Sequence, residues 1–161
     1  MVNKLKDVFG KQRVENCLSQ SGKSNFYIAE NDSTSQSYIA DETDEQFDID
    51  RCLKVYNVEE KEIHHISVDA CFLTQEYGYD GEKCDFVIFS EDKFCFTELK
   101  TNAESTKSKS IRRNIKKAMS QLGATINYFD DQEIDFSEHT LEAYIVLKKP
   151  LYPTDQASIK E

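Results

Sequence analysis

The chain has 161 residues, 39% of them hydrophobic, and its ten Phe and eight Tyr residues predict one folded domain over residues 1–161. The net charge of −10 at pH 7 counts against a general affinity for nucleic acid, because proteins that bind phosphate backbones usually have a basic surface. No apolar run is long enough to cross a membrane, and the first residues lack the apolar stretch of a signal peptide, so we expect no membrane partner.

The N-terminal third, residues 1–50, is predicted to contain one helix followed by an acidic segment. Residues 3–20 have an imperfect apolar stripe at helical spacing, and the short apolar run 26–29 is typical of a strand. Residues 31–50 are polar and acidic and are expected to form a loop or a mobile excursion. From Phe26 to Asp50 there are eight acidic residues and no Lys or Arg.

The rest of the chain alternates between strand-like and helical patterns. The periodicity of residues 108–129 indicates an amphipathic helix, with apolar positions from Ile111 through Met119 to Phe129 on one face. In order, the predicted elements are a strand at 62–73, hairpin strands at 84–90 and 93–99, the helix at 108–129, and a strand at 141–147. Both faces of the hairpin are apolar, which predicts central strands covered on both sides.

The hairpin brings charged residues together at its open end. A two-residue turn at Glu91-Asp92 pairs Phe89 with Phe94 and places Asp85 opposite Glu98. Like charges that face each other across a strand pair are destabilising, and Lys100 shares the face of Glu98. A divalent cation between the two carboxylates would remove their repulsion, and an oxygen-rich, partly hydrated site suits Mg²⁺ or Mn²⁺. The alternative is a structural cluster of one lysine and two carboxylates.

Asp85 followed by Glu98-Leu99-Lys100 resembles the motif of the PD-(D/E)XK nuclease superfamily, although Cys84 stands where the motif has its Pro. The resemblance covers residues 63–147 and implies an α/β (α+β) fold. Its restriction-endonuclease-like core is a central mixed β-sheet flanked by helices, with elements in the order strand, strand, strand, helix, strand.

The resemblance also implies roles for individual residues. Asp85, Glu98 and the Leu99 carbonyl would hold the metal, and Lys100 would position or activate the attacking water. Gln121, on the predicted helix, would be a polar residue near the site. Asp69, in the predicted strand 62–73, is a possible extra acid, and a solvated strand residue is the alternative.

A basic stretch begins at the proposed site. From Lys100 to Lys117 there are seven basic residues and one acidic residue, Glu104, so the chain is polarised despite its net charge. The residues expected to contact nucleic-acid phosphates are Lys107, Lys109, Arg112, Arg113, Lys116 and Lys117. The alternative is a solvated helix face that binds nothing.

The leading hypothesis is a Mg²⁺-dependent phosphodiesterase, either an endo- or an exonuclease, acting on nucleic acid, with DNA favoured over RNA. The resemblance implies that such an enzyme works as a homodimer or with a partner protein subunit. The alternative is a non-catalytic interaction or immunity-type protein on a nuclease-like fold, which would bind a basic partner through its acidic surface.

The five cysteines lie at positions 17, 52, 71, 84 and 95 and include no CxxC pair. Cys71, Cys84 and Cys95 fall within strand-like runs and are expected to be small buried hydrophobes. Together with the odd number of cysteines, this predicts a reducing compartment and therefore a cytoplasmic location.

Overall fold

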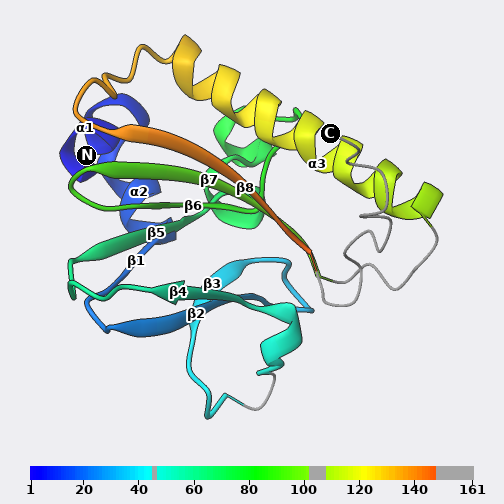
Figure 1. The fold of residues 1–161 in the computed structure, drawn as a ribbon. Helices are drawn as coiled ribbons and strands as arrows, with labels where there is room; N and C mark the ends of the chain where they lie inside the picture. The colour runs from blue at the N-terminus through cyan, green and yellow to red at the C-terminus, as the bar shows by residue number, and fades with distance from the viewer. Residues whose placement is uncertain (45–46, 102–107, 148–161) are drawn as a thin grey trace, which may run out of the picture.

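The computed structural model describes residues 1–44, 47–101 and 108–147, which form a mixed α/β fold with two β-sheets. The larger sheet has the strand order β1-β5-β6-β7-β8 (Figure 1). Its strands are β1 (Leu18–Ser21), β5 (Ile63–Ser67), β6 (Phe86–Phe89), β7 (Lys93–Lys100) and β8 (Thr140–Leu147). All neighbours are antiparallel except β7 and β8, which run parallel. The expected mixed sheet is therefore confirmed.

The order of elements in the predicted core is also observed. β5, β6 and β7 are consecutive antiparallel strands, and α3 (Ser108–Asp131) then returns the chain so that β8 can pair in parallel with β7. The predicted helix at 108–129 and the predicted strand at 141–147 are thus confirmed to within two residues.

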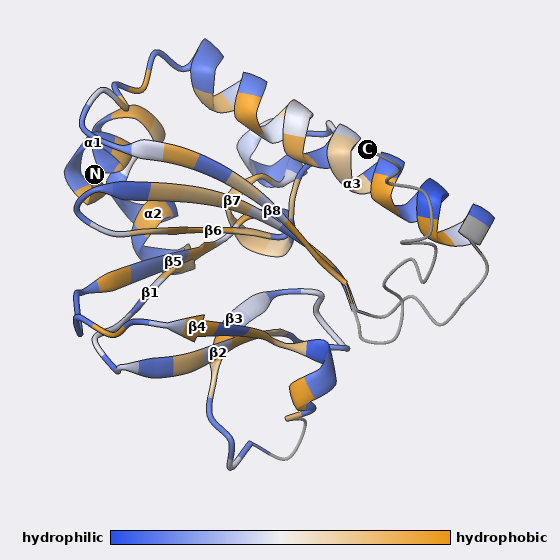
Figure 2. Cartoon of the chain, viewed as in Figure 1, coloured by the Kyte–Doolittle hydropathy of each residue, from blue (hydrophilic) through white to orange (hydrophobic). Residues whose placement is uncertain are grey.

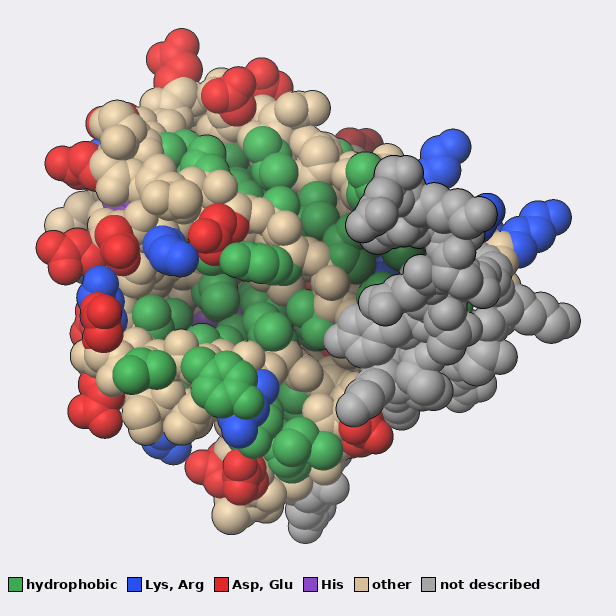
Figure 3. Space-filling model, in the orientation of Figure 1, with side chains coloured by type: hydrophobic (Ala, Val, Ile, Leu, Met, Phe, Trp, Pro, Cys, Tyr) green, Lys and Arg blue, Asp and Glu red, His purple; other side chains and the backbone are tan. Residues whose placement is uncertain are grey.

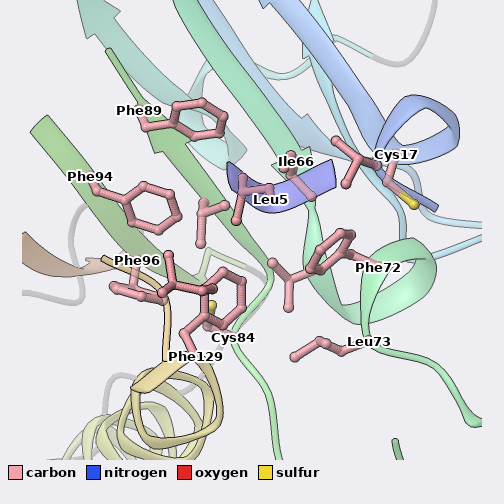
Figure 4. Close-up of a cluster of buried hydrophobic side chains, with 14 of the residues drawn as sticks. Leu5, Cys17, Ile66, Phe72, Leu73, Cys84, Phe89, Phe94, Phe96 and Phe129 are labelled. Atoms are coloured by element: carbon pink, nitrogen blue, oxygen red, sulfur yellow. The ribbon is translucent and has the colours of Figure 1, made fainter. Parts of the chain in front are cut away.

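Helices cover one face of the larger sheet. α1 (Val2–Phe9), α2 (Lys11–Cys17) and α3 contribute Leu5, Val14 and Phe129 to a buried cluster with side chains of β5, β6 and β7. Figure 4 shows Phe129 of α3 beside Phe96 of β7, and the two rings meet edge to face with centroids 5.4 Å apart. This packing fixes the position of α3 relative to β7.

The second sheet covers the opposite face, where a flanking helix was expected. It has the strand order β3-β2-β4, with β2 (Asn25–Glu30), β3 (Ser37–Ala40) and β4 (Leu53–Tyr56) all antiparallel. Phe26 and Ile28 of β2 pack against Phe86 and Leu99 of the larger sheet. The molecule therefore has three layers: helices, the large sheet and the small sheet (Figure 1). In Figure 2 the hydrophobic colour runs along β6 and β7, which are buried between the other two layers.

The hairpin has the predicted register. Phe89 pairs with Phe94 and Val87 pairs with Phe96. The Ser90 N–H donates to the Lys93 carbonyl at 2.9 Å, which closes the tight turn at Glu91-Asp92. The alternating aromatic and β-branched residues of both strands bury one set of side chains under the helices and the other against the small sheet.

Three sequence predictions for the N-terminal half are wrong. The helix expected over 3–20 is interrupted at Gly10, whose φ is +88°, and its last residues form β1 against β5. The strand expected over 62–73 ends at Ser67, and residues 68–72 form one turn of π-helix. Val68 and Phe72 lie four residues apart and both face the core, a spacing that one helical turn can satisfy as well as a strand. The acidic segment 31–50 contains β3 and the start of a 3₁₀ turn, Ile49–Arg51.

The structure pairs Cys17 with Cys71 in a disulfide between α2 and the π-helical turn. The expectation that Cys71 is a small buried hydrophobe within a strand is therefore wrong; Cys17 and Cys71 are distant in sequence, and only the fold brings them together. Cys84 and Cys95 are free and buried, as expected. The disulfide between Cys17 and Cys71 also weakens the argument that the cysteines indicate a reducing, cytoplasmic compartment.

Within the described residues, none of the helices has both the length and the apolar character that crossing a membrane requires.

Candidate functional site

The open end of the β6–β7 hairpin carries two acidic side chains. Phe86 pairs with Thr97, and continuing this register by one residue places Asp85 opposite Glu98, as the sequence predicted. The Asp85 carboxylate accepts a hydrogen bond from the backbone N–H of Leu99. Asp85 directly precedes the apolar strand β6, and Glu98 lies near the end of the apolar strand β7. At these positions burial makes the ionised form of each carboxylate costly in free energy.

Glu98 is the most unusual side chain of the site. Its exposed fraction is 0%, and its Oε1 accepts a hydrogen bond from the Lys100 ammonium. Its Oε2 is buried and has no hydrogen-bond partner among the residues that the structure describes. Burial, followed by the nearby negative charge of Asp85, raises the pKa of Glu98 to about 8, and Lys100 only partly opposes this effect. Without a cation, the site is therefore expected to hold a proton at neutral pH.

Burial also raises the pKa of Asp85 to about 6, against the lowering effects of the Leu99 hydrogen bond and of Lys100. Because the N–H and C=O of one strand residue point toward the same neighbouring strand, the Leu99 carbonyl also lies on the Asp85 side of β7. Two carboxylates and one backbone carbonyl thus converge on one region.

Lys100 is positioned by α3. Its Nζ donates to Oε1 of Gln121 at 3.1 Å, and Nε2 of Gln121 donates to the Lys83 carbonyl at 3.0 Å. One turn further along, Oγ1 of Thr125 accepts a bond from the Cys84 N–H at 2.8 Å. The middle of α3 is therefore fixed to the segment that leads into Asp85, and Gln121 lies beside Lys100 as the resemblance implied.

Asp69 lies at the edge of the same cluster, on the π-helical turn instead of a strand. The N–H groups of Val68 and Asp69 donate to the Asp85 carbonyl at 2.8 and 3.3 Å. The Asp69 carboxylate is 3.4 Å from Nζ of Lys83, and its negative charge contributes to the raised pKa values of Asp85 and Glu98. The structure thus places the proposed extra acid near the other two.

The sequence did not single out Glu30, Arg51 or Lys83, which also surround this cluster. Glu30 ends β2 and interacts electrostatically with Asp69, Arg51 and Lys100. An acidic residue at the end of an apolar strand is the pattern that identified Glu98, so the same signal was present at Glu30. No local pattern marks Arg51 or Lys83, which reach the cluster only through the tertiary fold.

The predicted phosphate-contacting residues lie in the first half of α3. Within the described part of the chain, Lys109, Arg112, Arg113, Lys116 and Lys117 are all exposed, whereas Lys107 lies outside the described residues. α3 begins beyond the ends of β7 and β8, and Lys and Arg side chains project at that edge (Figures 1 and 3). One prediction for this helix is wrong: Met119 is 63% exposed and does not belong to the apolar face.

A groove of about 550 Å³ separates the two sheets, and Figure 3 shows hydrophobic side chains gathered along it. Its walls are mainly aliphatic and aromatic, including Leu53, Tyr56, Ile88, Tyr144 and Val146. Its polar residues do not form a cluster of buried carboxylates. We therefore place the candidate chemistry at the end of the hairpin.

The donor set fits a hard divalent cation with part of its water shell retained. Carboxylate and carbonyl oxygens are the preferred ligands of Mg²⁺, and the partnerless Oε2 of Glu98 provides an acceptor that nothing in the described protein uses. Among the described residues, no group of three or more His, Cys, Asp or Glu side chains is arranged to hold a metal ion by itself. Water would therefore complete the coordination. Comparisons with protein-family models, with curated proteins and with solved structures gave no match to this chain.

Proposed function

We propose that this protein is a Mg²⁺- or Mn²⁺-dependent phosphodiesterase that acts on nucleic acid. The observation that carries the proposal is Glu98, a fully buried carboxylate beside a second acid and a lysine, with one oxygen that has no partner within the described part of the chain. A purely structural buried acid normally has its hydrogen-bonding capacity satisfied, and an unsatisfied one points to an ion or a ligand.

Each residue of the cluster has a distinct part in this proposal. Asp85, Glu98 and the Leu99 carbonyl would hold the cation, which when bound polarises a phosphate and lowers the pKa of a bound water. Lys100 has three N–H donors and cannot ligate a cation, so it would orient a water or donate to a phosphoryl oxygen. Gln121 would keep the Lys100 ammonium in place through its existing hydrogen bond.

The substrate class follows from the charge distribution around the site. The exposed cations of α3 lie on the helix that also supplies Gln121, so a polyanion bound along the helix would reach the carboxylate cluster. Contacts of this type hold phosphates without reading sequence. The observed order β5, β6, β7, α3, β8 also supports the expected restriction-endonuclease-like core. DNA as the preferred substrate, and a homodimer or partner subunit, remain parts of the proposal.

The test is a cleavage assay with labelled single- and double-stranded DNA and RNA in Mg²⁺, Mn²⁺ or EDTA. The wild type should cut at least one substrate in a metal-dependent way, and Asp85→Asn should abolish cutting. Asp92→Asn is the matched control, because Asp92 is an exposed carboxylate at the opposite end of the same hairpin. A wild type that cuts no substrate and binds no Mn²⁺ would instead favour an interaction protein that uses its acidic surface.

A further inference from the structure

The disulfide connects the layer of helices to the π-helical turn beside the candidate site. Cys17 is the last residue of α2, and Cys71 lies within the turn, which comprises Val68–Phe72. The Leu73 N–H donates to the Val68 carbonyl at 2.8 Å, which is the i to i+5 bond of this helix type. π-helical turns are rare and are frequently found at functional sites. A single turn has little stability of its own, so its conformation depends on the contacts that anchor it.

The turn contacts the candidate site at two points. The N–H groups of Val68 and Asp69 donate to the Asp85 carbonyl at 2.8 and 3.3 Å. The Asp69 carboxylate is 3.4 Å from Nζ of Lys83, and the Lys83 carbonyl accepts a bond from Nε2 of Gln121 at 3.0 Å. Gln121 in turn positions the ammonium of the site. The position of the turn therefore affects both the acidic and the basic side of the site.

Other contacts hold the two ends of the turn in place without the disulfide. β1 begins directly after Cys17 and pairs with β5, with Leu18 opposite Ile66. Nε of Arg13 in α2 donates to the Phe72 carbonyl at 2.6 Å, and the Phe72 side chain is 0% exposed. Figure 4 shows Cys17, Ile66 and Phe72 in one buried cluster. Opening the disulfide should therefore leave the core in place and release the middle of the turn.

Thiol–disulfide exchange can open this bond. Cys71 is half-buried whereas Cys17 is 5% exposed, so the sulfur of Cys71 is the accessible one. A thiolate of a dithiol reductant attacks this sulfur, which forms a mixed disulfide and releases the Cys17 thiolate. The second thiol of the reductant then displaces Cys71 and closes the reductant's own disulfide. The two cysteines thereby gain two electrons and two protons from the reductant. Burial raises the pKa of Cys84 and Cys95 to about 12, so these thiols stay protonated and do not compete.

We propose that the Cys17–Cys71 disulfide is a redox switch for the cation site. When the disulfide is closed, it holds the π-helical turn against Asp85 and supports cation binding. When a dithiol opens it, the turn is released and the site binds the cation more weakly. The inference rests on the proposed function, because it concerns the regulation of the same site. A purely structural crosslink would instead stabilise the whole fold and leave the cation affinity of the folded protein unchanged.

The test compares the oxidised full chain with the same protein reduced by a dithiol and then desalted under argon. A thiol count of three per chain before reduction and five afterwards confirms the two states. Calorimetric titration with Mn²⁺ alone should show about tenfold weaker binding after reduction, which is the lower end of the effect of losing outer-shell partners of a metal. Reoxidation should restore the affinity. In EDTA, reduction should speed amide hydrogen exchange at Val68 and Asp69 while the far-UV circular dichroism stays the same.

Two variants separate the switch from other effects of the reductant. The double variant Cys17→Ser/Cys71→Ser should bind Mn²⁺ as weakly as the reduced wild type, whether or not it has been treated with the dithiol. Cys52→Ser is the matched control, because it replaces a free thiol and should keep the full response to reduction.

The possible outcomes distinguish the switch from the proposed function. If the oxidised and reduced proteins are both folded and bind Mn²⁺ equally well, the switch is overturned while the proposed function survives. Unchanged amide exchange at Val68 and Asp69 would overturn it too, because weaker binding would then not arise from the turn. If reduction unfolds the chain, the disulfide is a structural crosslink and the switch is again overturned. If the oxidised wild type binds no Mn²⁺, the proposed function itself fails and the switch fails with it.

Discussion

Replacing Glu98 with Gln should change how the stability of the metal-free protein depends on pH. The pKa of Glu98 is raised from its ordinary value of 4.5 to about 8 in the folded protein. Between these two values the folded state keeps a proton that the unfolded chain has released. Stability therefore falls as pH rises through this window, in contrast to the usual behaviour of a paired carboxylate.

The size of the effect follows from the shift. One pKa unit corresponds to about 1.36 kcal/mol, so the contribution of Glu98 should fall by roughly 3 kcal/mol between pH 5 and pH 8. Because Glu98 is completely buried, solvent does not screen this penalty. Gln cannot ionise, so the side chain at position 98 would no longer release a proton in this pH range. The stability of Glu98→Gln relative to wild type should thus increase by roughly 3 kcal/mol over that range.

The assay is urea unfolding in EDTA at pH 5, 6.5 and 8, with wild type and Glu98→Gln measured side by side. The exposed Glu133→Gln is the control, and its difference from wild type should stay constant. Saturating Mn²⁺ should reduce the pH dependence of the wild type, because a cation takes the place of the proton. A constant difference between Glu98→Gln and wild type across the three pH values would refute the reasoning.

Three further changes test the rest of the account. Lys100→Ala should abolish cleavage and leave Mn²⁺ binding largely intact, since an ammonium donates to water or phosphate and does not ligate metal; equal loss of both in titration and cleavage assays would contradict this role. Charge reversal at Arg112 and Arg113 should reduce the slope of log affinity against log salt by about 1.8 for duplex DNA, at about 0.9 per phosphate contact, and an unchanged slope would remove this face of α3 from the binding surface. Cys17→Ser should lower the free energy of unfolding by about 4 kcal/mol in non-reducing buffer, since the disulfide closes a loop with a sequence separation of 54. Cys52→Ser, which replaces a free thiol, should lower it much less. Equal losses of stability in the two variants would argue that Cys17 and Cys71 are not joined.

The elements that were predicted correctly are those whose pattern is local and strong. The hairpin strands are apolar on both faces with one polar turn between them, so a single register buries their apolar side chains and places Asp85 opposite Glu98. The long helix α3 has enough turns for its periodicity to be unambiguous, apart from the exposed Met119. Because Asp85, Glu98 and Lys100 are tied to these elements, their convergence was predictable from the sequence.

The elements that were missed depend on contacts between distant parts of the chain. β1 and β3 have four residues each and are stabilised by pairing or hydrogen bonding to β5, which no local pattern reveals. Residues 68–72 read equally well as a strand or as a helical turn, and their bonds to the Asp85 carbonyl favour the turn. Glu30 ends an apolar strand, as Glu98 does, but only the packing of the second sheet shows that it lies near the other acids.

The central claim is that the carboxylates of Asp85 and Glu98 hold a divalent cation. The most direct measurement is an anomalous difference map from crystals grown with saturating Mn²⁺. The account predicts one strong peak in contact with both carboxylates and near the Leu99 carbonyl, with Lys100 beside a metal-bound water or a phosphate. An absence of any peak there, with Asp85 still bonded to the Leu99 N–H and Glu98 still bonded only to Lys100, would contradict it.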